Sequence, residues 1–467
     1  MATDFKLSNL GLVAFCPELN QGLPMYQMTA TGGSGTTITV AAGSGVAALY
    51  PDSGTASLWT DKLNGLWVYF TSGSNSGTAY AITDTAWSAD VLTITTTTMD
   101  NTPSASDTFE IYGVLAASSV SFNIGNDNIT RDDLHRQTLD PASSLKGLQS
   151  ATFSFDAELI GLETALENGV SAVFDRYSQL MLLAGSRTAT AGNVVSGNSS
   201  TTTQVDVTSA AGFSAGDYVM ISGEVRKVTA TDTVSTPDNI TVSPALSAAP
   251  EDTTQVYGTE RFIPYDTGHP SATFFHLVDD QLRVIQGAEI TIGISGTMGE
   301  KVTLNVEGTG EGFSVTDPKT FSSIMPWSTN APLKFVVGEF FFGSTEYGAN
   351  LMNFTLGQGQ EVLRDTLENQ QVHTTTRAAT LQANLRNQSE NLKTSTEANG
   401  TQSNLIASWS SSSSEPYGNT VAVAGNAQVQ DPASYTSVAG IEYYDVTFGF
   451  VDDQDATSST KPELIRA

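Results

Sequence analysis

Residues 287–308 read GAEITIGISGTMGEKVTLNVEG, and this stretch decides the fold class. Isoleucine fills every second position from 290 to 294, and after a turn Val302, Leu304 and Val306 repeat the pattern. The positions between them carry Thr, Gly, Asn and Glu. Side chains of a strand point alternately to its two faces. The alternation therefore predicts two antiparallel strands, each buried on one face and exposed to solvent on the other.

The same alternation recurs in ATFSFDAEL at 151–159 and in VTFGF at 446–450. One amphipathic helix is expected over about 171–184, with Gly185 as its stop. The segment from about 395 to 440 contains five consecutive serines and predicts a long polar loop. The chain is therefore expected to be all-β with a minor α component.

The composition argues against several classes of function. The chain has 49 acidic and 20 basic residues and a formal net charge of −29. This balance argues against a surface that binds the phosphate backbone of nucleic acids, because such surfaces need clustered Lys and Arg. Cys16 is the only cysteine, so neither an internal disulfide nor a cysteine zinc site is expected. The sequence has no HExxH or GxSxG motif and no apolar run of about 18 residues. We expect no enzyme activity, no metal or cofactor, and no membrane span.

Two stretches of the sequence, 28–113 and 187–258, share one pattern. Each begins with a Thr-rich strand, TTITV at 36–40 and TQVDV at 203–207, and continues through a hydrophobic strand that ends at Gly. They close on DTFEIYG and DTTQVYG. The pattern predicts two copies of a small β-barrel or sandwich, each inserted into a larger framework with its entry and exit close together.

The remaining framework also contains a repeat. SFNIG at 121–125 and NFTLG at 353–357 are each followed by an Arg-Asp pair and then by Ala-Thr and an alternating strand. We therefore predict a duplicated β-sandwich or barrel module. The predicted division is residues 1–27 with 114–186 as the first module, 28–113 and 187–258 as the small inserted domains, and 259–467 as the second module.

The order of these pieces resembles the duplicated tail tube protein family of siphophage-type bacteriophages. SFNIG, the Arg-Asp loop, Lys146-Gly147, FDAELIG and a helix closing on LMLLAG are similar to the family's first half. TFFHLVDDQLRVIQG, the hairpin after it and VAGIEYYDVTFGFV are similar to its second half. The resemblance covers about 114–186 and 259–452. It implies a virion structural protein that forms stacked rings, with three duplicated chains giving a pseudo-hexameric ring.

The resemblance also implies partners and a location. Other copies of the chain would form homotrimeric rings, and the tail tip, tape measure and tail terminator proteins would contact the tube. DNA would pass through the lumen during ejection without specific binding. The protein would be assembled in the host cytoplasm and reside in the virion tail.

The duplicated Arg-Asp pairs are candidate inter-subunit contacts. Arg131 and Asp132 of the first copy correspond to Arg364 and Asp365 of the second. One interpretation is an ion pair across the ring, and the other is a salt bridge within each loop. Both interpretations stay open at this point.

Asp156 and Glu158 are the candidate lumen residues, because they alternate with Phe153 and Phe155 on one strand. Acidic side chains lining a conduit would repel passing DNA. The alternative function is a carbohydrate- or host-surface-binding β-sandwich of the virion. For that function the five tryptophans at 59, 67, 87, 327 and 409 would be the first candidates.

Overall fold

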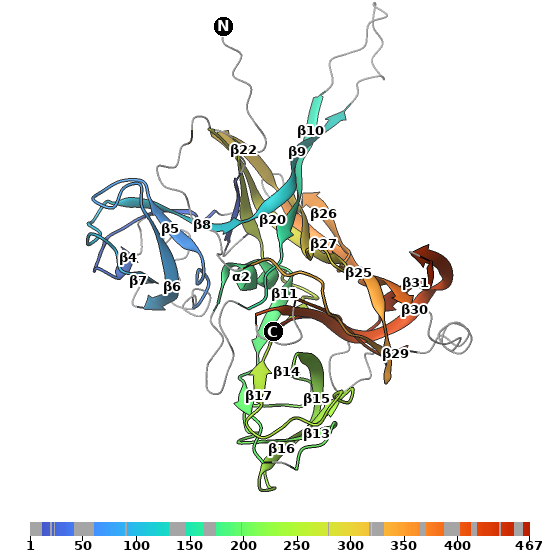
Figure 1. Cartoon of the computed structure of the whole chain (residues 1–467). Coiled ribbons are helices and arrows are strands. Elements are labelled where there is room, and N and C mark those ends of the chain that lie inside the picture. Colours follow the sequence, from blue (N-terminus) through green and yellow to red (C-terminus); the bar gives the residue numbers. More distant parts are fainter. Residues whose placement is uncertain are drawn as a thin grey trace, which may run out of the picture.

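The computed structural model describes the chain in segments separated by short gaps. The described residues are 12–18, 21–22, 24–41, 60–88, 91–129, 145–162, 174–197, 199–278, 280–316, 319, 331–364, 370–386, 402–411, 418–438, 440–452 and 461–467. They form a nearly all-β protein with several antiparallel sheets and a single helix, so the predicted fold class is confirmed (Figure 1).

Fourteen strands form two units of seven, which we call unit A and unit B. Unit A consists of β1 (Leu12–Pro17), β9 (Ala117–Ile129), β10 (Leu145–Glu158), β19 (Ala272–Val278), β20 (Gln281–Thr297), β21 (Thr303–Gly310) and β22 (Gly312–Thr316). Unit B consists of β23 (Phe340–Phe342), β25 (Ala349–Thr355), β28 (Thr380–Arg386), β29 (Gln402–Ser410), β30 (Thr420–Val438), β31 (Ile441–Phe450) and β32 (Glu463–Arg466).

The two units have the same topology. Four strands of unit A pair in the order β9–β10–β21–β20, and the matching strands of unit B pair in the order β25–β28–β31–β30. The remaining strands pair as β1–β19–β20–β22 in unit A and as β23–β29–β30–β32 in unit B. Even the register is shared, since Phe122 lies opposite Phe153 in unit A and Phe354 opposite Leu381 in unit B.

Pairing of β20 with β25 joins the two sets of four into one sheet of eight strands, which we call the front sheet. Strands β20 and β30 also continue into the two smaller sheets, β1–β19–β20–β22 and β23–β29–β30–β32, which we call the back sheets. The change of sheet in β20 falls at Gly287, whose φ of 63° favours glycine. A Cβ there would lie 2.6 Å from the side chain of Glu311.

Two sequence predictions differ from this arrangement. The boundary between the units falls between β22 and β23 rather than at residue 259, because β21 pairs with β10 of the first hairpin and β20 pairs with β21, which places both strands in unit A. The stretch 395–440 is not one long loop, since it contains β29 and most of β30. Residues 405–410 of β29 and 420–425 of β30 are all buried, the polar Ser408, Ser410 and Thr420 among them.

The two small domains share a strand order as well. The first pairs as β2–β8–β5–β6–β7–β4 and the second as β12–β17–β14–β15–β16–β13. A β-bulge interrupts β6 at Thr83 and β15 at Thr229, and each threonine hydroxyl donates to a carbonyl of the facing strand. The strands of the first are β2 (Gln27–Thr29), β3 (Gly32–Gly33), β4 (Thr37–Ala41), β5 (Trp67–Phe70), β6 (Ala79–Ser88), β7 (Val91–Thr96) and β8 (Thr108–Leu115). Those of the second are β12 (Asn193–Val194), β13 (Gln204–Val207), β14 (Tyr218–Ile221), β15 (Glu224–Asp232), β16 (Asp238–Ser243) and β17 (Gln255–Gly258).

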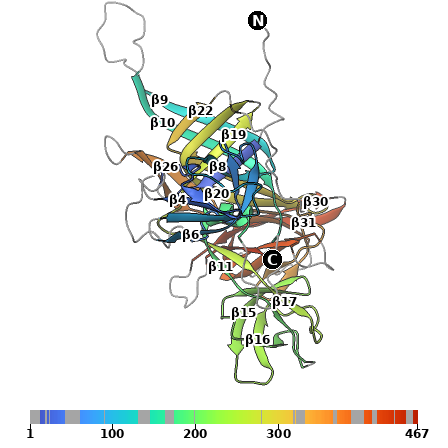
Figure 2. The same cartoon turned by 90° about the vertical axis from the view of Figure 1, so that its left-hand side faces the viewer.

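Both small domains connect to back sheets and project from the framework. β8 pairs with β1, and β17 leads into β18 (Glu260–Pro264), which pairs with β32 and with β11 (Gly185–Ala189). Figure 2 shows the second small domain at the end of the molecule opposite the β9–β10 hairpin. Short hairpins complete the described strands: β24 (Thr345–Tyr347) and the pair β26 (Gln358–Arg364) with β27 (Gln370–Arg377).

Helix α2 (Arg176–Leu182) confirms the core of the predicted helix. It begins after Asp175, whose carboxylate accepts a hydrogen bond from the Ser178 amide at 2.7 Å. Residues 171–173, where the prediction began, lie outside the described residues. Tyr177 and Leu180 are buried against the sheets, as the helical spacing predicted.

Candidate functional site

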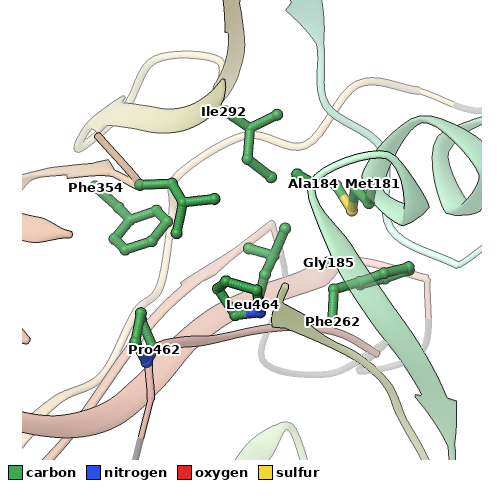
Figure 3. A pocket seen from close by; sticks show the side chains of 10 residues that line it. Met181, Ala184, Gly185, Phe262, Ile292, Phe354, Pro462 and Leu464 are labelled. Carbon is green, nitrogen blue, oxygen red and sulfur yellow. The ribbon is translucent and has the colours of Figure 1, made fainter. Parts of the chain in front are cut away.

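The front sheet has one apolar face, as the alternation predicted. One row of residues crosses seven strands and is buried throughout: Ala157, Leu304, Ile294, Phe354, Leu381, Phe448 and Val429. Figure 3 shows Ile292 and Phe354 from this face beside Met181 and Ala184 at the end of α2. The void between them measures about 10 Å³, so this face is packed core and offers no ligand site.

The opposite face of the same strands is polar. Three neighbouring rows contain only Gly, Ser, Thr, Asn, Gln, Asp and Glu. They are Ser154–Glu307–Thr291, Asp156–Asn305–Gly293–Thr355–Thr380–Gly449, and Glu158–Thr303–Ser295–Asn353–Gln382–Thr447. We call this surface the polar face. A fourth row, Thr297–Leu351–Asn384–Asp445, brings in one apolar side chain.

The polar face is hollowed. Two adjoining hollows of about 360 Å³ each lie over β9, β10, β20 and β21, and both are lined by Ser154, Thr291 and Glu307. Asp156 and Asn305 line one of them, and Thr152 and Gln358 line the other. Their lining is predominantly hydroxyl, amide and carboxylate, with the rings of Phe153 and Phe155 turned into the core.

Each unit holds one carboxylate on the polar face with an amide from the neighbouring strand. In unit A the Asn305 amide donates to Asp156 on β10 at 2.6 Å. In unit B the Asn384 amide of β28 donates to Asp445 on β31 at 2.5 Å. Asn384 occupies the position in unit B that Asp156 occupies in unit A, because both follow the matched residues Leu381 and Phe153 by three. The two units therefore keep one acid–amide pair but exchange its members.

Positive charge on the polar face is sparse. Lys301, in the turn between β20 and β21, lies 3.2 Å from Glu158, and both side chains are about half exposed. A pair in such contact with water contributes little stability. Glu307 is exposed between Ser154 and Thr291, with no cation within salt-bridge distance among the described residues. The face is thus acidic and hydrated, a surface that repels polyanions.

The structure places the predicted lumen pair on this polar face, since Asp156 and Glu158 are neighbours two residues apart on β10. The predicted interface pairs are not tested in the same way. Arg131, Asp132 and Asp365 lie outside the described residues. Arg364 ends β26 opposite Gln370, and its side chain also lies outside the described part. Sequence reasoning missed Asn305, Asn384 and Asp445, because their partners lie 61 to 149 residues away.

The residues singled out for sugar binding do not gather at one site. Trp409 is fully buried, and Trp67 and Trp87 lie apart from the polar face in the first small domain. Trp59 and Trp327 lie outside the described residues. Within the described segments, no three His, Cys, Asp or Glu side chains are grouped as a metal site requires. No helix in the same segments has the length and hydropathy needed to cross a membrane.

No protein-family model matches the chain, and no curated protein sequence matches it. The assignment of function therefore rests on the resemblance in motif order and on the geometry of the front sheet.

Replacing Asn305 by leucine is expected to lower the free energy of unfolding by about 1–2 kcal/mol, because Asp156 would lose its partner in a half-buried position. The double exchange Asp156→Asn with Asn305→Asp recreates in unit A the order found in unit B. It should stay within about 0.5 kcal/mol of the parent. Denaturant melts of the three proteins provide the measurement, and equal losses in both variants would contradict the pairing.

A group of carboxylates lies where β20 changes sheet. Glu18 is buried and accepts hydrogen bonds from Thr273 and Ser271 and from the amides of Gly22 and Gly287. Burial raises its pKa above the ordinary value despite these bonds. Burial, followed by the negative charges of Glu18 and Glu289, raises the pKa of the half-buried Glu311 to about 7.

Glu311→Gln is expected to stabilise the protein above pH 7. The folded chain holds the Glu311 proton more tightly than the unfolded chain, so stability falls as the pH rises from about 4 to 7 and stays lower beyond it. Solvent screening at this half-exposed site reduces the gain to about 1 kcal/mol. Thermal melts at pH 5 and pH 8 test this, and an equal effect at both would contradict it.

Proposed function

We propose that the chain is a structural, non-enzymatic protein of a phage tail that assembles as trimeric rings stacked into a tube for DNA. The front sheet is the observation that carries this proposal. It combines a hollowed acidic face, two units of identical topology, and two margins, β9 and the part of β30 beyond Gln428, that pair on one side only among the described residues. A polar face of this extent cannot be the filled interior of a small barrel, so it suits a wide aqueous channel.

The register of the front sheet supports a particular channel size. A row that starts at Asp156 on β10 reaches Thr380 on β28, which is the unit B equivalent of Thr152. The row thus shifts by four residues over four strands. With about 3.3 Å per residue and about 4.8 Å between strands, that shift corresponds to a strand tilt of roughly 35°.

At this tilt, three chains contributing their front sheets would close a barrel roughly 45 Å across between backbones. Side chains of about 5 Å on each wall would leave an opening of about 35 Å. B-DNA, with grooves about 8 Å deep, is roughly 20 Å wide. Two chains would leave an opening of only about 20 Å, with no room for water. Three chains leave about 8 Å on each side, close to one Debye length at physiological salt.

The remaining parts of the chain suit the same assembly. The small domains are attached to back sheets, so they would decorate the outside of the tube and leave the channel clear. The β9–β10 and β26–β27 hairpins extend from matching places in the two units toward the same end, where they would reach a neighbouring ring.

Negative-stain electron microscopy of the purified chain tests the proposal. We expect hollow rings or tubes whose end-on views have threefold or pseudo-sixfold symmetry and an opening of about 35 Å. Compact single particles at every concentration would contradict the proposal and would redirect work to glycan-binding screens.

A further inference from the structure

We propose that neighbouring chains join by repeating the junction between units A and B, with β30 of one chain paired to β9 of the next in a register that sets Thr436 opposite Ser121. This inference rests on the proposed ring, and it specifies how the ring closes. The partner is a second copy of the same chain.

The junction inside one chain is the template. Strand β20, the last strand of unit A in the front sheet, pairs antiparallel with β25, the first strand of unit B. Ser295 lies opposite Asn353 in this pair, and Gly293 lies opposite Thr355. The junction continues the polar rows without a break, so the two units share one polar face.

The matched topology transfers this register to the free edges. On β31, Tyr443 lies two residues before Asp445 and faces Thr436, just as Thr303 lies two residues before Asn305 and faces Ser295. Thr436 of β30 is therefore the equivalent of Ser295. Ser121, one residue before Phe122, is the equivalent of Asn353, one residue before Phe354. The template pair Ser295–Asn353 thus becomes Thr436 opposite Ser121 of the second copy.

Both strands that the proposal joins are edges in the single chain. Among the described residues, β9 pairs only with β10, and β30 beyond Gln428 pairs only with β31. Seven strand spacings of about 4.8 Å put these edges roughly 34 Å apart along the sheet. The two edges therefore do not pair with each other within one chain. When copies of the chain lie side by side, β30 of one copy meets β9 of the next.

Burial differs between the junction that is present and the one that is missing. Leu356, just after β25, is 3% exposed, and its amide donates to Ile292 of β20. Its unit A equivalent on the free edge, Ile124, is 44% exposed. The back sheets repeat this contrast, because β32 is buried and paired with β18, whereas Val315 on the equivalent strand β22 is 47% exposed. A second copy at this edge would cover both exposed side chains.

Disulfide trapping tests the register. The variant Ser121→Cys with Thr436→Cys places two cysteines in directly opposed positions, whose Cα atoms lie about 4.5–5.5 Å apart, within reach of a disulfide. Cys16 is buried and gives no background. Oxidation of assembled protein should produce covalent dimers and trimers on a non-reducing gel.

Two matched variants control the chemistry. Ser295→Cys with Asn353→Cys forms the template pair and should close within one chain. Ser121→Cys with Ser437→Cys points one thiol to the other face and should not link chains. Tubes that form without the Ser121–Thr436 link, or that link better through Ser437, would overturn the register and leave the tube proposal standing. Parent protein that forms neither rings nor tubes would overturn both.

A surface substitution provides a second, independent readout. Ile124→Glu should prevent ring formation while leaving the chain folded, because it places a charge in the proposed contact. Val234→Glu is the control, since Val234 is 91% exposed in the connection between β15 and β16 of the second small domain. Sedimentation should show unassembled chain only for the first variant, and equal assembly of both would count against the junction.

Discussion

Replacing Arg466 by alanine is expected to lower the free energy of unfolding by about 3–5 kcal/mol, because it leaves buried charges without a partner. The guanidinium of Arg466 is fully buried on β32. It lies 3.0 and 2.7 Å from the two carboxylate oxygens of Asp175 and 3.2 Å from Glu260, and it donates to the Gly161 carbonyl at 2.7 Å. These contacts tie Asp175, at the start of α2, and Glu260 on β18 to the last strand of unit B.

The pH dependence of this ion pair has a definite sign. Burial alone raises the pKa of Asp175, but the charge and hydrogen bonds of Arg466 outweigh burial and hold the pKa below its ordinary value. The folded state therefore gains stability above the ordinary carboxylate pKa and loses it as the pH falls below about 4.

Denaturant melts at neutral pH measure the effect of Arg466→Ala, and Lys461→Ala is the matched control. Lys461 pairs with Asp266, which is 61% exposed, so its loss should cost under about 1 kcal/mol. A similarly small loss for Arg466→Ala would contradict a stabilising role for these buried contacts.

Glu307→Lys is expected to convert a tube that ignores DNA into one that retains it. Glu307 is exposed on the polar face opposite Ser154 and Thr291, so a lysine there fits without disturbing the core. Each ring would gain a lysine from every chain, and stacked rings would present them in series. A duplex touching about six of these lysines would lose roughly a thousandfold in affinity between about 50 and 200 mM salt.

Co-sedimentation of labelled duplex DNA with assembled tubes measures this retention. The control is Glu251→Lys, which makes the same change in charge on an exposed residue of the second small domain. Retention by the Glu307 variant alone supports a channel lined by the polar face. Equal retention by both variants would mean that the polar face does not line the channel.

The sequence predicted local structure well and long-range pairing poorly. The alternation in 287–308 and 151–159 is a local property of strands, and the buried side chains follow it. The strand order was out of reach, because β10 pairs with β21 across a whole inserted domain. The segment 395–440 was wrongly taken as a loop, because Ser is typical of loops, yet Ser408, Ser410 and Thr420 are buried in the paired strands β29 and β30.

For the site, the sequence identified the acidic pair on β10 but not what holds it. Asp156 and Glu158 alternate with the apolar residues Phe155, Ala157 and Leu159, and that pattern alone gives their face. The amides that hold Asp156 and Asp445 come from other strands, so only the sheet register reveals them. The roles of Arg131, Asp132, Arg364 and Asp365 stay predictions.

The two free margins of the front sheet make ring assembly cooperative. Two chains joined at one margin still expose two edges, and so does an open row of three chains. Each added chain therefore gains one contact and loses the translational and rotational entropy of one molecule. Closing the third chain onto the first costs no further encounter, because the ends are held at a high effective concentration. Assembly should therefore pass from single chains to complete rings with few dimers at equilibrium, and ring formation should begin sharply above a threshold concentration.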